Sequence, residues 1–227
     1  SCYKSVNQCN AVIESLENND IPGLDEDLKT RFLAESLFIR AHYFYHLVQQ
    51  FGDIPMPLKP TNSVETTAHK TKVDEVWNQI VTDLEFAVEN LPETYQASEF
   101  GHITKYAAMH HLSRVYLTLK RSDDDLKKAL NYAEQVINSG KYSLVKSHAE
   151  LWDINNKNNS EVLFSVLYTQ NAELNGDGNT AHMYFCSAYS EEHPAVKRVI
   201  EYGRPWSRER SSDFAISLFD KTKDQRW

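Results

Sequence analysis

Apolar residues recur every three or four positions along much of the chain, the spacing that places side chains on one face of an α-helix. The first such stripe joins Val6, Ile13 and Leu16 through a run of mostly polar residues. Four more stripes of the same period follow it before Gly140. We therefore predict amphipathic helices over residues 2–18, 25–50, 71–91 and 104–119, and a fifth that begins after Ser122 and ends at Gly140.

The second predicted helix is apolar on most of its sides and ends abruptly at the sequence FGDIP. A helix of that kind packs between several neighbours, so its aromatic residues are expected to fill helix–helix contacts. Gly52 permits a left-handed backbone at the helix end, while Pro55 and Pro57 prevent the helix from resuming. The carboxylate of Asp53 can accept hydrogen bonds from nearby backbone amides. The turn is therefore predicted to be architectural and to let the chain cross to the next hairpin.

Two helix starts carry side chains that are suited to capping. Thr71 with Asp74, and Ser122 with Asp125, match the capping box, in which two side chains satisfy free backbone amides. The fourth and fifth helices are joined by a short link and form a helical hairpin, as do the first and second. Stacked hairpins with small and aromatic residues at their contacts are typical of tetratricopeptide-type solenoids. The predicted fold class is mostly α, a tetratricopeptide-like α-α superhelix of helical hairpins with a loop-rich face and little strand.

The pattern changes after Gly140. The short apolar run Val162–Tyr168 contains β-branched and aromatic residues, which predicts a strand. Residues 170–212 mix glycines, prolines and scattered aromatic residues, which predicts a long irregular segment of a kind that is usually functional. A short helix is predicted over residues 212–220. We expect residues 1–140 to form a helical scaffold, and residues 141–227 a loop-rich region packed on it within the same structural unit.

Charge and composition narrow the partners. The formal net charge is −8, which disfavours a nucleic-acid partner because its phosphates would be repelled. No stretch approaches the roughly 20 apolar residues that a membrane-spanning helix needs. The cysteines, Cys2, Cys9 and Cys186, have no metal-ligand spacing such as CxxC. We expect neither a metal nor a cofactor.

Catalytic motifs find little support in the sequence. His42 and His46 lie four residues apart on a helix and could share a metal ion, but no HExxH accompanies them, so histidines that pack in the core are favoured. The acidic run at 123–125 lacks the other positions of a calcium loop and suits a helix start instead. Glu191 and Glu192 are adjacent, and nothing in the sequence places a second carboxylate opposite either one. We predict that the protein is not an enzyme.

Sugar binding requires aromatic faces that stack on pyranose rings, and polar groups that bond to hydroxyls, in loops rather than in helix cores. Trp77 and Trp152 lie on apolar helical faces and are expected in the core. The alternative for any loop aromatic is that it only packs the loop down. The candidate glycan-binding residues of the irregular segment are Trp206, Tyr184, Tyr189 and Arg204.

Several stretches in a fixed order resemble a known family. The first is FLAESLFIRAHYFYHLVQQFGDIPMPL, an aromatic helix that ends in FGDIP. It is followed by GHITKYAAMHHLSRVYL, by ALNYAEQVINSGKYSLV with NNSEVLFSVLY, and by SSDFAISLFDKTKDQR. This series resembles the SusD/RagB family, and FGDIP after that helix is its most specific part. The resemblance covers essentially the whole chain.

The resemblance implies a surface-exposed outer-membrane lipoprotein that binds oligosaccharides or polysaccharides beside a TonB-dependent, SusC-like transporter. It also implies a lipid anchor on a cysteine, whereas Cys2 lies in mid-helix sequence. We therefore expect the chain to be an internal part of a longer protein. The expected function is non-catalytic glycan binding at the cell surface, for delivery to that transporter. The alternatives are a tetratricopeptide scaffold that binds peptides or proteins, and an α-helical glycoside hydrolase with two carboxylates facing one cleft.

Overall fold

The computed structural model describes residues 2–18, 21–63, 67–153, 155–168, 171, 184 and 211–224. The chain divides into two compact units. The first contains residues 1–144 together with 158–165, and the second contains residues 145–157 together with 166–227.

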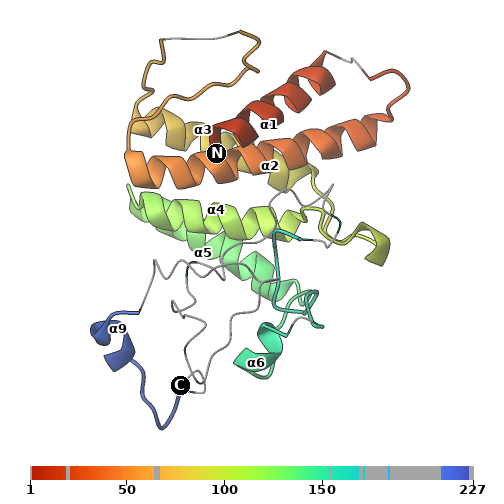
Figure 1. The fold of residues 1–227 in the computed structure, drawn as a ribbon. Helices are drawn as coiled ribbons and strands as arrows, with labels where there is room; N and C mark the ends of the chain where they lie inside the picture. Colours follow the sequence, from red (N-terminus) through yellow and green to blue (C-terminus); the bar gives the residue numbers. More distant parts are fainter. Residues whose placement is uncertain are drawn as a thin grey trace, which may run out of the picture. The chain divides into compact units, whose positions relative to one another are not determined.

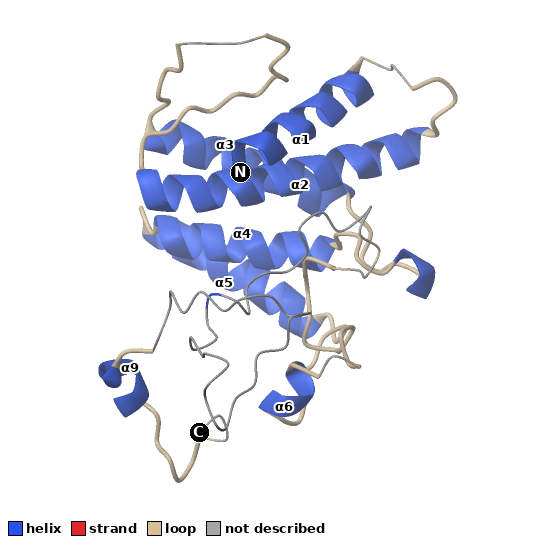
Figure 2. Cartoon of the chain, in the orientation of Figure 1, coloured by secondary structure: helices blue, strands red, loops and turns tan. Residues whose placement is uncertain are grey.

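The first unit is a row of antiparallel helices (Figures 1 and 2). Each of the five long helices contacts the next one along the chain, from α1 against α2 to α4 against α5. This arrangement confirms the predicted helical hairpins and the predicted helix positions. The helices are α1 (Cys2–Glu17), α2 (Glu26–Phe51), α3 (Val73–Asn90), the 3-10 turn η1 (Ala97–Glu99), α4 (Lys105–Leu119) and α5 (Asp123–Asn138).

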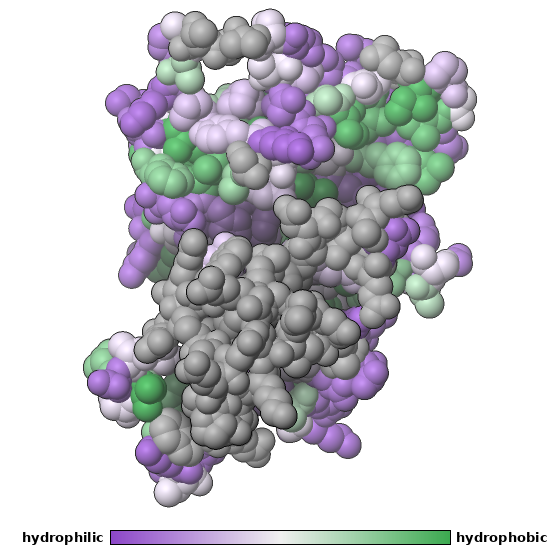
Figure 3. Space-filling model, viewed as in Figure 1, coloured by the Kyte–Doolittle hydropathy of each residue, from purple (hydrophilic) through white to green (hydrophobic). Residues whose placement is uncertain are grey.

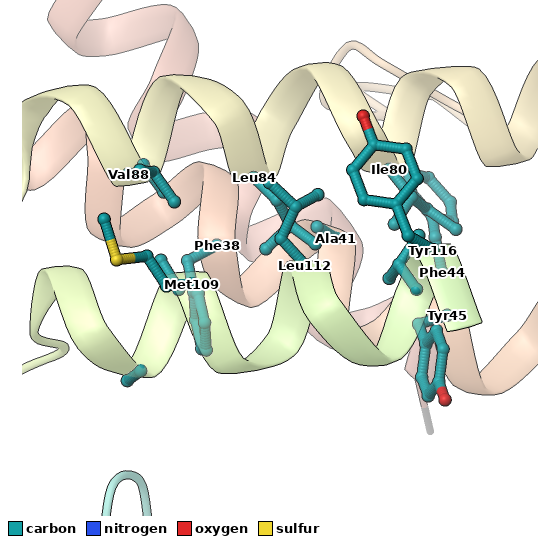
Figure 4. Packing of buried hydrophobic residues seen from close by; sticks show 14 of the residues in the cluster. Phe38, Ala41, Phe44, Tyr45, Ile80, Leu84, Val88, Met109, Leu112 and Tyr116 are labelled. Atoms are coloured by element: carbon teal, nitrogen blue, oxygen red, sulfur yellow. The ribbon is translucent and has the colours of Figure 1, made fainter. Parts of the chain in front are cut away.

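The core of this unit lies where α2, α3 and α4 meet (Figure 4). Phe38 and Phe44 of α2 are almost completely buried, as is the predicted core residue Trp77 of α3. Burying one such side chain stabilises a fold by about 1.5–3 kcal/mol, which explains why this part of the sequence is so rich in aromatic residues. Apolar side chains of α3 and α4 face one another in this core, namely Ile80, Leu84 and Val88 with Met109, Leu112 and Tyr116.

A buried ion pair joins the first three helices. The guanidinium of Arg40 on α2 donates to both carboxylate oxygens of Asp83 on α3 at 2.8 Å, and to the amide oxygen of Asn10 on α1 at 3.1 Å. The amide nitrogen of Asn10 donates to the carbonyls of Pro57 and Lys59, which follow the FGDIP turn. Burial raises the pKa of Asp83, and the Arg40 guanidinium opposes that rise.

The FGDIP turn has the predicted architecture. Gly52 ends α2 with φ 67° and ψ −119°, a backbone conformation that residues with a Cβ rarely adopt. Asp53 Oδ1 accepts a hydrogen bond of 3.0 Å from the Val73 amide, and Asp53 Oδ2 lies 3.1 Å from the Lys72 ammonium. These bonds to Asp53 lower its pKa. The turn therefore links the end of α2 to the start of α3.

The two predicted capping boxes have different outcomes. Ser122 caps α5 by accepting from the Asp125 amide, as predicted. The prediction for Thr71 is wrong, because α3 begins after Lys72 without a side-chain cap of its own, and Thr71 instead forms an isolated β-bridge with Ile54. The Asp53 carboxylate from the preceding turn occupies the role that Thr71 was expected to fill.

The predicted strand Val162–Tyr168 is also wrong. Within the described residues this stretch forms no ladder with a neighbouring strand. The amide of Val162 bonds back to the Asn159 carbonyl in a turn, and the ring of Phe164 packs against α2. Leu163 and Phe164 pack on the helical core, whereas the apolar side chains at 166–168 are exposed, so the run is neither a strand nor fully covered.

The described part of the second unit contains two short helices, α6 (His148–Leu151) and α9 (Asp213–Ser217). The second of them confirms the helix predicted near residue 212. Trp152 was expected in the core, but its side chain is 73% exposed, and its indole nitrogen donates to His148 at 3.0 Å. The expectation fails because a four-residue helix has no continuous face to bury.

Both polar and apolar residues reach the surface of the α1–α2 hairpin (Figure 3). Across the described part of the chain, no helix combines the length and hydropathy that crossing a membrane requires.

Candidate functional site

A cavity of about 310 Å³ opens in the first unit. Three separate stretches line it: the connection from α3 to α4, the two residues that follow Gly140, and the returning segment 158–165. Its lining is rich in aromatic rings, hydroxyls and side-chain amides. The lining residues include Tyr95, Glu99, Phe100, His102, Thr104, Tyr142, Asn158, Ser160 and Phe164.

Tyr95 and His102 form one wall of the cavity, and α2 holds them in place. Their rings are stacked with centroids 5.2 Å apart. The Tyr95 hydroxyl lies 2.9 Å from Glu35 Oε1 and 3.1 Å from the Ile103 carbonyl, and His102 Nδ1 also lies 2.9 Å from Glu35 Oε1. Burial, reinforced by the Glu35 carboxylate, raises the pKa of Tyr95, so its phenol stays a hydrogen-bond donor.

Arg31, one turn before Glu35 on α2, also contacts residues of this wall. Its guanidinium bonds to Glu99 Oε1 at 3.1 Å and lies 5.4 Å from the centroid of the Tyr95 ring. A cation over an aromatic face is attracted by the electron-rich ring. One turn of α2 therefore sets the position of the connection between α3 and α4.

The opposite wall is built from the segments that follow α5. The hydroxyls of Tyr142 and Thr104 are 3.1 Å apart, and the Tyr142 ring meets Tyr106 edge-on at 6.0 Å. Ser143 donates its amide to the Ser160 carbonyl at 3.0 Å, which ties the returning segment to the end of the hairpin. Further along that segment, the Phe164 ring meets Phe38 at 5.2 Å.

These side chains suit a ligand that is flat on one face and rich in hydroxyls. Phe100 is 40% exposed and offers a ring for stacking, while Asn158 and Ser160 offer donors and acceptors. The carboxylates of Glu35 and Glu99 accept hydrogen bonds from Tyr95 and Arg31. A pocket with apolar rings and a few oriented polar groups is the common form of a small-molecule site.

The predicted glycan-binding residues are not part of this described lining. Trp206, Tyr189 and Arg204 lie outside the described residues, and Tyr184 is a half-buried helical residue of the second unit. All four therefore stay predictions. Sequence reasoning missed Tyr95, Phe100 and His102, although the stretch ETYQASEFGH between two predicted helices is unusually aromatic for a connection.

The histidines that were considered as metal ligands pack as rings. His42 and His46 meet at 83° with their centroids 4.6 Å apart. Among the described residues, no group of three His, Cys, Asp or Glu side chains is placed to hold a metal ion.

Comparison with known proteins adds a family context. Residues 1–117 match the family SusD-like_3, which is described as starch-binding and associating with the outer membrane. The SusD-like protein P25 of Formosa agariphila is 26% identical over 165 residues, which are 72% of this chain and 30% of that protein. A SusD-like protein of Bacteroides ovatus is 28% identical over 181 residues, covering 72% of this chain and 31% of that protein. This chain thus spans about a third of the length of these curated relatives.

Solved structures share the fold. A SusD superfamily protein from Parabacteroides distasonis aligns with a TM-score of 0.73 and 25% identity, over 83% of this chain and 40% of that one. A laminarin-binding SusD-like protein aligns with a TM-score of 0.67 and 28% identity, over 75% and 37% of the two chains. A structure determined with a xylogluco-oligosaccharide aligns with a TM-score of 0.67 and 26% identity, over 74% and 34%. These likenesses confirm the predicted, mostly helical fold class.

Proposed function

The chain belongs to the SusD-like family, and on that premise we propose that it binds glycans without transforming them, at the cell surface, for delivery to a TonB-dependent, SusC-like transporter. The observation that carries the proposal is the family match over residues 1–117, because its description names both starch binding and the outer membrane. The names of two similar structures support it, since one is laminarin-binding and the other holds a xylogluco-oligosaccharide.

The cavity beside α4 is the part of the described structure that suits a glycan. We assign the stacking role to Phe100, with Tyr95 and His102 holding the wall beside it. Asn158 and Ser160 would bond to hydroxyls from the other side. The predicted segment Ala172–Ser212, with Trp206 as its main stacking residue, is proposed to supply further glycan contacts.

The two alternatives differ from this proposal in what they need. A tetratricopeptide scaffold would bind peptides in a concave groove, and its affinity for them would not depend on Phe100. A glycoside hydrolase would need two carboxylates that face one cleft and are free to exchange protons. Glu35 and Glu99 are engaged in hydrogen bonds with Tyr95 and Arg31, which favours a structural role for them in the wall and supports the binding proposal.

The role of the cavity in glycan binding is tested by calorimetry at pH 7.5. The ligand is a glycan first identified on a glycan array. Phe100→Ala should weaken binding by about ten-fold or more, because losing one aromatic platform costs about 1–3 kcal/mol at comparable flat-ligand sites. Phe51→Ala is the matched control, since Phe51 is 66% exposed on α2 and does not line the cavity. Wild-type affinity in a folded Phe100→Ala variant would remove the cavity from the binding site.

The irregular segment is tested in the same assay with Trp206→Ala. A loss of affinity at an unchanged melting temperature is expected. If Trp206→Ala, Tyr184→Ala and Tyr189→Ala all bind as the wild type does, the segment has no binding role.

Delivery to a transporter is a separate claim. It predicts that the full-length protein co-purifies with a SusC-like transporter from outer membranes. If the two proteins purify separately in mild detergent, the delivery claim is contradicted. The claim of glycan binding is not affected by that result.

A further inference from the structure

Three histidine rings lie in contact where α2 and α4 face the returning segment. His42 of α2 meets His46 of the same helix at 4.6 Å between ring centroids, and His111 of α4 at 5.3 Å. His111 also contacts Phe38 at 5.6 Å and Tyr45 at 4.9 Å. His42, His46 and His111, with His110 beside them on α4, are called the imidazole cluster below.

The charges around this cluster all have one sign. Among the described residues, the charged or basic groups that act on His42 are His46 of α2 and Arg114 of α4. On His111 they are His42 and His46 of α2 and His110 and Arg114 of α4. The phenol rings of Tyr43 and Tyr45, also on α2, contact His42 and His111. The returning segment contributes the uncharged ring of Phe164 to the contact. Within the described part of the chain, no carboxylate acts on either imidazole to compensate a positive charge.

The cluster is therefore built for neutral rings. Burial, together with the neighbouring bases, lowers the pKa of His42 to about 4 and that of His111 to about 3. His111 is 5% exposed, and its Nε2 has no hydrogen-bond partner among the described residues. A proton on His111 would be buried without a counter-ion, and a proton on the half-buried His42 would have only basic groups beside it, which is unfavourable in both cases.

Phe164 connects the cluster to the cavity. Its ring meets His42 at 5.7 Å and 71°, and Phe38 at 5.2 Å and 72°. The same residue lines the cavity, at the end of a segment whose other end is tied through Ser160 to Ser143. The contact between Phe164 and His42 thus holds one edge of the cavity wall against α2.

We propose that the imidazole cluster makes this wall acid-sensitive, so that protonation of His42 displaces Phe164 and loosens the cavity. Lifting the ring would expose His42 to water, where its charge is solvated. The opening reaction itself does not depend on what the cavity binds. It rests on the proposed function only in that the loosened cavity would be the glycan site.

The expected size follows from linkage. An imidazole that titrates near 4 when covered and near 6.5 when exposed should favour the open state by about 30-fold more at pH 5.0 than at pH 7.5. The opening should be local, because α1 and α3 contain no histidine and so contribute no ring to the cluster.

Amide hydrogen exchange of the full chain, without glycan, measures this opening directly. The amides of Glu161 and Val162, which bond to Asn159, report on the segment that carries Phe164. After correction for intrinsic exchange, their protection should fall by about 30-fold between pH 7.5 and pH 5.0. Amides of α1 and α3 should remain better protected than the segment at both pH values, because they exchange only when the whole unit unfolds.

Two variants separate the proposed cause from a general effect of acid. His42→Gln, which cannot be protonated, should keep the same protection of residues 158–165 at both pH values. His69→Gln is the matched control, since His69 is exposed in the connection before α3 and should respond as the wild type does. If His42→Gln proves poorly folded, His46→Gln replaces it and should reduce the acid response, because one like charge is removed.

The proposal is overturned if wild-type protection of the segment does not change with pH, or if His42→Gln shows the same fall. It is equally overturned if the segment is as well protected as α1 and α3 at pH 5.0, since all three would then exchange only by global unfolding. Because no glycan is present, the result is independent of the calorimetry at pH 7.5 that tests the proposed function.

Discussion

Helices α2 and α5 are both amphipathic, yet they are used very differently. Nine residues of α2 are buried, among them Phe38, Phe44 and Tyr45, whereas three residues of α5 are buried. Leu130 and Ile137 of α5 are 58% and 73% exposed. The difference follows from position in the row, because α2 has α1 and α3 on its sides, while α5 packs mainly against α4 among the described helices. Apolar periodicity therefore indicates a helix, but not how much of that helix is covered.

Truncating one apolar side chain on each helix should show the largest difference in stability between α2 and α5. Phe44→Ala should lower the free energy of unfolding by about 3–5 kcal/mol, because it leaves a cavity in a fully buried site. Leu130→Ala should change it by less than about 0.5 kcal/mol, because Leu130 is already in water. Urea denaturation of both variants measures the two values. Equal losses would show that α5 has a covered face in solution.

Removing the buried carboxylate should be nearly as costly. Asp83→Ala leaves the Arg40 guanidinium buried without its partner, and breaking such a pair typically costs about 3–5 kcal/mol. Lys128→Ala serves as the surface comparison, because its pair with Asp124 on α5 is exposed. That pair should contribute at most about 0.5 kcal/mol. If the urea midpoint of Asp83→Ala equals that of the wild type, the prediction is contradicted, and the Arg40 guanidinium must be hydrogen-bonded to water or to another acceptor in the variant.

Acid should weaken the contact between α2 and α4, which contains the imidazole cluster, but not the contact between α4 and α5. The pKa of His42 is about 4 and that of His111 about 3 in the folded protein, both below the unfolded value of about 6.5. The unfolded state therefore binds more protons below pH 6.5, so stability is constant above that pH and falls as the pH drops toward 4. Each histidine contributes a slope that approaches about 1.4 kcal/mol per pH unit in that window, and the two together should remove about 4 kcal/mol between pH 7 and pH 5.

Urea denaturation at several pH values checks this sign and size. His111→Gln should flatten the pH dependence, whereas His69→Gln should leave it unchanged. A stability that rises on acidification would contradict the description of an uncompensated imidazole cluster.

The turn that ends α2 should give the smallest of these losses. Gly52→Val should lower stability by about 1–2 kcal/mol, because the side chain is forced into a positive-φ conformation although there is room for a Cβ. Gly52→Ala should cost a similar amount for the same reason. Thermal melting of the two variants is the measurement, and an unchanged melting temperature would show that the turn adopts another backbone conformation.

The sequence predicted the helices well because each depends on a local repeat that can be read directly. The start of α3 was predicted less well, because its cap comes from Asp53, twenty positions before the Val73 amide that it accepts. The cavity could not be predicted, since it assembles Tyr95, Tyr142 and Phe164 from three stretches that only the folded hairpins bring together. The apolar run around Phe164 predicts a strand, but only Leu163 and Phe164 pack on the helices and the apolar residues at 166–168 are exposed, which the local pattern does not reveal.

The central claim is that the protein binds glycans and leaves them intact. A polysaccharide panel, applied to the full chain with affinity and product size measured in the same samples, tests it most directly. The account predicts saturable binding of at least one glycan, whose chain length and reducing-end content remain unchanged after prolonged incubation. Absence of binding to every glycan tested, or release of reducing sugar that is abolished by changing a single Asp or Glu, would contradict it.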